Sequence, residues 1–245
     1  AGKRDLTRPL VALAEAVLEV SMTVIRHAMR FAPIAVFGLI AQTTATTGMG
    51  VLVDLAIYSI AVLAGLVILL ALYLALAAAF GRISPFAFAR AAAPVQLLAF
   101  STSSSAAVMP LTMKTAVDRL AVAPALAGAV VPLAATINMA GTALYQAGAI
   151  VFLANQSGVL LSPVDLALIM VTLVGASVGA PAAPGASFAV LAATAANVGV
   201  PAEGLALIFG VDRLLDMART AVNVTGDLVA CRILAVSGDK APVNA

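Results

Sequence analysis

Five polar side chains recur at helical spacing in the last apolar stretch of the chain. Asp212, Asp216, Arg219, Asn223 and Asp227 are separated by four, three, four and four residues. A helix with about 3.6 residues per turn places all five on one face. Ionisable groups on an apolar helix are costly in a membrane and usually mark a substrate or ion pathway. The alternative, a structural ion pair between Asp216 and Arg219 in a soluble helical core, explains only two of the five.

The composition predicts a polytopic, all-α membrane protein of the cell (inner) membrane. Of the 245 residues, 63% are hydrophobic and 10% charged, whereas soluble domains are about 25% charged. The net charge of +2 and the lack of a basic run argue against a nucleic-acid partner. The single cysteine, Cys231, excludes an intrachain disulfide and a cysteine-built metal site. The chain begins AGKRDLTR, without an initiator Met or signal peptide, so we expect it to start inside a longer reading frame.

The elements that must position the polar face can be read from apolar runs, breaks and flanking charges. Basic residues flank both ends of residues 84–120, whose two arms are each too short to span a bilayer. By the positive-inside rule this segment is a hairpin entering from the cytoplasm; a cytoplasmic loop with an amphipathic helix is the alternative. The segment 162–200 has Asp165 and Glu203 at its flanks and no base, so we expect it to enter from outside.

These segments form a repeated pattern. The expected order is one or more transmembrane segments in 1–50, a transmembrane helix at 51–80, a hairpin at 84–120, a broken helix at 122–153, a hairpin at 162–200 and the polar-faced helix at 203–236. The two hairpins enter from opposite sides, and each precedes a long helix. The fold class predicted is therefore an inverted repeat of re-entrant helical hairpins and broken transmembrane helices, as in secondary transporters.

Four motifs in this order carry a family resemblance. They are SSSAAVMP at 103–110, ATINMAGTALYQ at 135–146, APGAS at 183–187 and LDMARTAVNVTGD at 215–227. The chain resembles the dicarboxylate/amino acid:cation symporter family over nearly its whole length. The resemblance implies a homotrimer in the lipid bilayer, an elevator mechanism, and no cofactor beyond Na⁺ or H⁺ as coupling ions. Residues 1–50 would then be scaffold, residues 51–245 the transport domain, and the first three or so helices would be missing.

The resemblance implies a site for an acidic amino acid. Arg219 would bind the side-chain carboxylate of aspartate or glutamate, and Asp216 the ammonium group. A dicarboxylate without an amine would leave Asp216 facing like charge, which favours the amino acid. The full set of implied substrate residues is Ser104, Ser105, Thr142, Ala183, Gly185, Ser187, Asp216, Arg219, Thr220 and Asn223.

The resemblance also implies cation sites. The implied ligands are Ala134, Thr136, Asn138, Ser177, Val178, Ala180, Asn223 and Asp227. A third sodium site would use an aspartate at the position of Ala140, and a methyl group cannot replace that carboxylate. We therefore expect fewer coupled sodium ions, or partial coupling to protons. Asp212 is the candidate proton carrier, because a carboxyl group in a low-dielectric site favours its neutral form.

Two other functions remain open at this level. One is a C4-dicarboxylate:cation symporter, and the other is a substrate-gated anion channel or sensor on a degenerate transporter. An enzyme is the weakest reading, because the sole histidine, His27, is far from the serine-rich hairpin tip in the expected topology, and no nucleotide or metal motif is present.

Overall fold

In a computed structural model of the chain, the described residues are scattered positions between 9 and 45 and the ranges 48–177, 186–201 and 204–238. The chain divides into two units, residues 1–51 and 52–245. In the first unit, the described positions between 9 and 45 are all helical.

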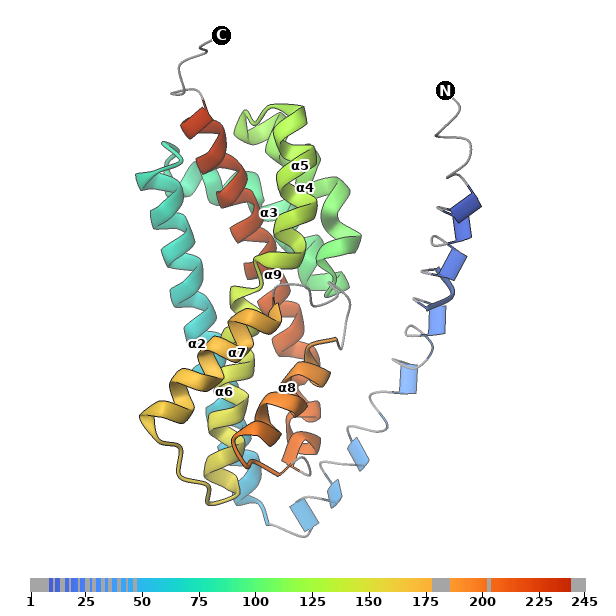
Figure 1. Cartoon of the computed structure of the whole chain (residues 1–245), viewed down its shortest axis with the longest axis vertical. Helices are drawn as coiled ribbons and strands as arrows, with labels where there is room; N and C mark the ends of the chain where they lie inside the picture. Colours follow the sequence, from blue (N-terminus) through green and yellow to red (C-terminus); the bar gives the residue numbers. More distant parts are fainter. Residues whose placement is uncertain are drawn as a thin grey trace. The chain divides into compact units, whose positions relative to one another are not determined.

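The second unit is built from α-helices throughout its described part (Figure 1). They are α2 (Gly50–Ala79), α3 (Pro85–Thr102), α4 (Ser105–Leu120), α5 (Pro124–Ile137), α6 (Ala140–Gln156), α7 (Pro163–Ser177), α8 (Ala186–Asn197) and α9 (Leu205–Gly238).

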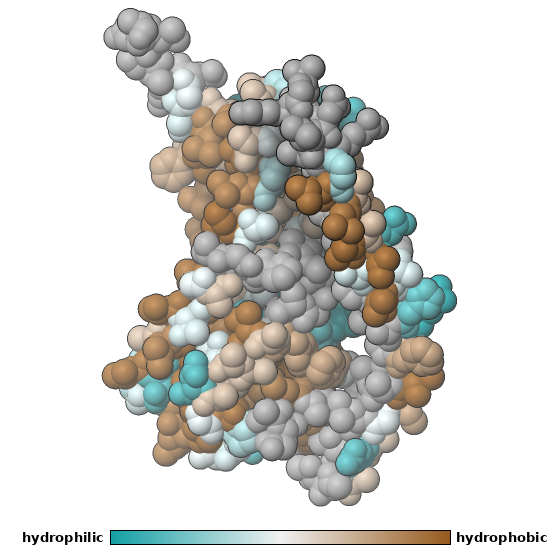
Figure 2. Space-filling view, turned by 45° about the vertical axis from the view of Figure 1, so that its right-hand side comes forward, coloured by the Kyte–Doolittle hydropathy of each residue, from teal (hydrophilic) through white to brown (hydrophobic). Residues whose placement is uncertain are grey.

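Apolar side chains cover much of the outside of these helices. Three helical segments of the described chain are long and apolar enough to cross a membrane: Gly50–Ala79, Pro124–Gln156 and Leu207–Gly238. Only 17% of the most apolar window of α2 is buried against the rest of the protein. Figure 2 shows hydrophobic residues spread over the visible face rather than gathered in one patch. Such a surface suits lipid rather than water.

The helices α3 and α4 form a hairpin with a narrow tip. Ser103, at φ 52°, ends α3 in the left-handed region, and its N–H donates to the Ala99 carbonyl. Ser104 then caps α4 by accepting from the Ala107 N–H. Of the serine-rich segment 101–105, Ser105 begins α4, and Ser101 and Thr102 stay helical at the end of α3. The Ser101 and Thr102 hydroxyl groups donate to the Leu98 carbonyl group, so both polar groups have a hydrogen-bond partner within the last turn of α3.

The helices α5 and α6 follow one another with a break at Asn138–Met139. The break lies within residues 122–153, for which a broken helix was predicted. The Asn138 N–H still reaches the Ala134 carbonyl at 2.7 Å, but its side chain turns toward α9. Two residues after Met139, Gly141 lets α6 approach α9 closely, because a Cβ at this position would lie 2.9 Å from Asn223 Oδ1.

The 34-residue helix α9 runs through the unit and organises it. In Figure 1, α3 and α4 lie along its C-terminal half, and α8 lies toward its N-terminal half, where Phe188 stacks on Phe209 at 3.9 Å. Near its other end, Arg232 donates to the Gly81 carbonyl at 2.8 Å and to the Leu120 carbonyl at 3.0 Å. The ends of α2, α4 and α9 are thereby held together.

Candidate functional site: a buried charged cluster on α9

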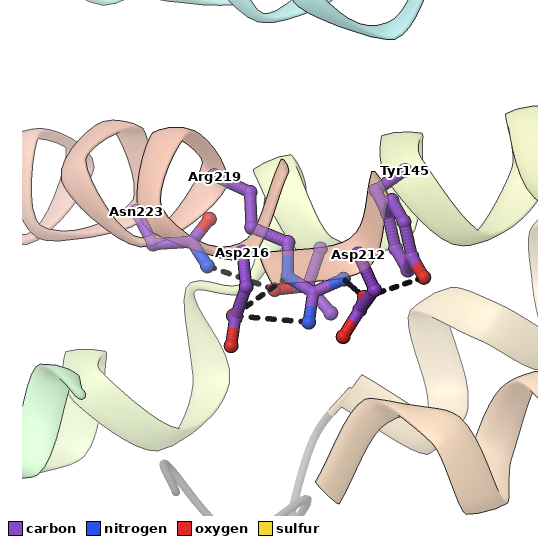
Figure 3. A network of polar contacts seen from close by, with 6 residues as sticks. Tyr145, Asp212, Asp216, Arg219 and Asn223 are labelled. Atoms are coloured by element: carbon purple, nitrogen blue, oxygen red, sulfur yellow. Dashed lines mark hydrogen bonds and ion pairs between the residues drawn. The ribbon is translucent and has the colours of Figure 1, made fainter. Parts of the chain in front are cut away.

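The predicted polar face of α9 points into the protein. Arg219 is only 2% exposed, yet its side chain carries a full charge. Figure 3 shows its guanidinium between two carboxylates of the same helix. Arg219 Nε and Nη2 each lie 3.0 Å from Asp216 Oδ1, and Nη1 lies 3.5 Å from Asp212 Oδ1. The structural ion pair considered above is therefore present, but it is part of a larger network.

Tyr145 of α6 completes the cluster. Its ring lies under the guanidinium, 4.0 Å from Arg219 Cζ to the ring centroid, and its hydroxyl donates to Asp212 Oδ1 at 2.7 Å. The cation is thus held by two carboxylates and one aromatic face. We assigned no role to Tyr145 from sequence, although it lies in one of the motifs noted above.

One helical turn further, Asn223 connects α9 to the start of α6. Its Nδ2 donates to Thr142 Oγ1 at 2.9 Å, and its Oδ1 accepts from the Gly141 N–H at 2.8 Å. Both ends of the amide are therefore oriented. Of the residues expected to contact substrate, Asp216, Arg219, Asn223 and Thr142 are brought together by these contacts.

A second polar group surrounds Asp227 at the α5–α6 break. Asn138 Nδ2 donates to Asp227 Oδ1 at 2.9 Å and to the Asn223 carbonyl at 3.1 Å, and Tyr73 donates to Asn138 Oδ1 at 3.0 Å. Asp227 is 1% exposed. Within the described ranges, no basic side chain lies at ion-pair distance from it.

Close packing at this point depends on Gly226. A Cβ there would overlap Asn138 Nδ2 and lie 2.7 Å from Tyr73 Oη. Gly226 thereby lets the Asp227 carboxylate and the Asn223 carbonyl group both lie beside Asn138. Carboxylate and carbonyl oxygens are ligand types that hard cations use.

Other predicted residues are placed with fewer contacts. Thr220 and the hairpin-tip residues Ser104 and Ser105 are buried. The Ala134 carbonyl accepts from Asn138, and the Thr136 hydroxyl donates to the Leu133 carbonyl. Ala140 is exposed at the start of α6. Ser177 and Ser187 are placed only as helical backbone in α7 and α8, and four further predicted residues lie outside the described residues: Val178, Ala180, Ala183 and Gly185.

Comparison with known proteins decides the family. The model of the sodium:dicarboxylate symporter family matches residues 1–237. The chain belongs to this family. It is 38% identical over 227 residues to the proton/sodium-glutamate symport protein of Bacillus subtilis and 37% identical to the proton/glutamate-aspartate symporter of Escherichia coli. It is also 37% identical over 224 residues to excitatory amino acid transporter 3 of Mus musculus.

Membership confirms several expectations. This symporter family consists of transporters rather than enzymes. With three membrane-capable helices in its described part, the chain is a multi-pass protein of the cell membrane. The matches cover 93% of this chain but 53% and 52% of the two bacterial symporters. The chain thus spans about half the length of the curated relatives it matches.

The aromatic contacts were the main feature missed from sequence. The chain has three tyrosines, Tyr58, Tyr73 and Tyr145, and all three are buried. Two of them donate hydrogen bonds to the polar groups of the site. Tyrosine deep in a predicted membrane helix is a usable signal, because its hydroxyl group needs a partner there.

Proposed function

We propose that the protein containing this chain is a symporter that moves aspartate or glutamate with sodium ions, protons or both. The bacterial relatives at 37–38% identity are named as glutamate or glutamate-aspartate symporters. The main support for the proposal is the Arg219–Asp216 pair, whose residues are only 2% and 6% exposed.

This pair suits a substrate that carries both charges. A ligand carboxylate can take the place of Asp216 on the Arg219 guanidinium, while the ligand ammonium pairs with the Asp216 carboxylate. The exchange leaves no buried charge without a partner, which is the main cost of opening such a pair. Thr220, Asn223 and Thr142 would complete the polar contacts, with Ser104 and Ser105 at the α-carboxylate.

The charges of the site also distinguish the symporter of acidic amino acids from a dicarboxylate carrier and from a channel or sensor. A C4-dicarboxylate brings two negative charges and no ammonium, so Asp216 would face like charge. A channel or sensor needs no coupling site, whereas the buried Asp227 carboxylate beside Asn138 supports one. The acidic amino acid therefore remains the leading substrate class.

For the coupling ion, we propose a sodium site at Asp227. Asn138, Asn223 and the Ala134 carbonyl would supply further oxygens. A second site would use carbonyls of Thr136, Ser177, Val178 and Ala180. The tip of the second hairpin would form an extracellular lid over the site, with Ala183, Gly185 and Ser187. With Ala140 in place of a carboxylate, we propose fewer than three sodium ions per substrate and Asp212 as the proton carrier.

The transport mechanism follows the family expectation. We propose re-entrant hairpins at α3–α4 and α7–α8, an inverted repeat, residues 1–50 as scaffold and residues 51–245 as a transport domain that moves like an elevator within a homotrimer. The placement of the two helix pairs toward different halves of α9 supports this arrangement (Figure 1).

The deciding experiment is aspartate uptake into proteoliposomes that contain the full-length protein. We expect accumulation under an inward sodium gradient, inhibited by glutamate and not by succinate. Accumulation under a proton gradient alone would assign coupling to protons. Succinate uptake with no aspartate uptake would favour the dicarboxylate carrier, and aspartate-dependent current without accumulation would favour the channel.

A further inference from the structure

A basic hollow lies between the start of α3 and the end of α4. It has a volume of about 340 Å³ and is lined by Phe86, Ala87, Arg90, Ala91 and Arg119. A neighbouring hollow of about 120 Å³ shares Arg119 and is otherwise lined by Pro94, Leu111, Lys114, Thr115 and Asp118. We call the two together the α3–α4 groove. It shares no residue with the Arg219 cluster.

The charges in the groove are unbalanced. Lys114 Nζ pairs with Asp118 Oδ2 at 2.7 Å, so these two neutralise each other. Arg90 and Arg119 are exposed, and neither forms an ion pair with any residue of the described chain. Two guanidinium groups from different helices thus line one hollow without a protein counter-charge. An anion between them would relieve their repulsion and offer oxygens to both.

The surface next to these arginines is apolar. Phe86 is 79% and Leu97 71% exposed. Phe86, Arg90 and Leu97 are four and seven residues apart, so they share one face of α3. Arg90 lies five residues from the start of α3 at Pro85, about 7 Å along the helix axis. A positive charge just inside the helix end, beside exposed apolar side chains, matches a lipid headgroup with its acyl chains better than a free anion.

The position along the chain favours the same ligand. The open end of the α3–α4 hairpin is basic and carries Arg82, Arg90, Lys114 and Arg119. The positive-inside rule places this end at the cytoplasmic side. The cytoplasmic leaflet carries the anionic lipids, and basic pockets between helices on that side bind phosphate headgroups.

We propose that the α3–α4 groove binds the phosphate headgroup of an anionic phospholipid. Arg90 and Arg119 hold the phosphate oxygens, since a guanidinium presents paired donors to such an anion. The acyl chains run inward along Leu97, and Phe86 borders the headgroup at the start of α3. The site does not depend on the substrate or coupling ion proposed above.

The test measures lipid-dependent thermal stability of the delipidated full-length protein in detergent. Phosphatidylglycerol should raise the unfolding temperature of the wild type, whereas phosphatidylcholine and inorganic phosphate should not. Each Arg→Gln substitution at Arg90 or Arg119 should weaken the apparent affinity for phosphatidylglycerol about fivefold. The double variant should bind more weakly than either single variant, and because both arginines contact one phosphate the two effects are coupled. Arg82→Gln is the matched control, an exposed arginine near the same helix end that lines neither hollow.

Three results would overturn the proposal. They are an unchanged phosphatidylglycerol response in the double variant, an equal response of the wild type to phosphatidylcholine, and an equal response to inorganic phosphate, which would indicate a free-anion site. Arg90→Lys with Arg119→Lys keeps both charges but loses the paired donors of the guanidinium groups, so it should bind phosphatidylglycerol more weakly than the wild type. This variant carries the test if the double Gln protein does not fold: an unchanged phosphatidylglycerol response in it would contradict binding by paired donors.

Discussion

Replacing Asp227 by asparagine should separate a cation site from a structural carboxylate. Asp227 is 1% exposed, and its carboxylate accepts a hydrogen bond from Asn138 Nδ2 at 2.9 Å. The variant Asp227→Asn keeps the size of the side chain and an oxygen that can accept that bond. It removes the negative charge and replaces the second carboxylate oxygen by an amide NH2 group, so a lost sodium response reports on what the carboxylate binds.

The expected effect of Asp227→Asn on the free energy of unfolding depends on whether sodium is present. Burying a carboxylate costs several kcal/mol, of which a hydrogen bond to the charged group returns about 1.5–3 kcal/mol. Without sodium, the free energy of unfolding of Asp227→Asn should therefore exceed that of the wild type by about 1–3 kcal/mol. The variant should accordingly unfold at a higher temperature. Sodium at a hundred times its Kd should stabilise the wild type by about 2.7 kcal/mol and leave the variant unchanged.

The assay is thermal unfolding of the full-length protein in detergent, in sodium chloride and in choline chloride at equal ionic strength. Asp118→Asn is the control, because Asp118 is 49% exposed and pairs with a surface lysine. A variant that is less stable in choline and keeps the full sodium response would refute a cation role for Asp227. Because coupling is reciprocal, aspartate affinity at fixed sodium should also fall in Asp227→Asn.

Three further substitutions test the rest of the site. Arg219→Ala should lower aspartate affinity more than a hundredfold by calorimetry, because a buried charge pair loses one partner; unchanged affinity would remove Arg219 from the substrate site. Gly226→Ala should weaken sodium binding at least tenfold and cost about 1–3 kcal/mol of unfolding free energy, since its Cβ overlaps Asn138; wild-type values in sodium titrations would contradict this packing. Tyr145→Phe should lower the free energy of unfolding by about 1.5–3 kcal/mol, because it removes a hydrogen bond to the charged Asp212. Thermal unfolding measures this loss, and a Tm equal to that of the wild type would show that the bond adds no stability.

Much of the helix order was accessible from sequence. The break at Asn138–Met139 was predictable because Thr136, Asn138 and Gly141 interrupt an apolar run with residues that disfavour helix. The inward direction of the α9 face was predictable because its five polar residues share one helical stripe. The width of the hairpin tip was not, since Ser101 and Thr102 can either leave a helix or bond back to its carbonyl groups.

Local spacing determined which residues of α9 lie together: Asp212, Asp216 and Arg219 are within two turns, and a helix brings them into contact whatever surrounds it. Only the tertiary structure decided what meets that face. Tyr145 lies 67 residues from Asp212 in the sequence, and Tyr73 lies 65 residues from Asn138. No periodicity records contacts at such separations. Packing of α2 and α6 against α9, at glycines small enough to permit it, converts a polar stripe into one cluster around Arg219 and a separate one around Asp227.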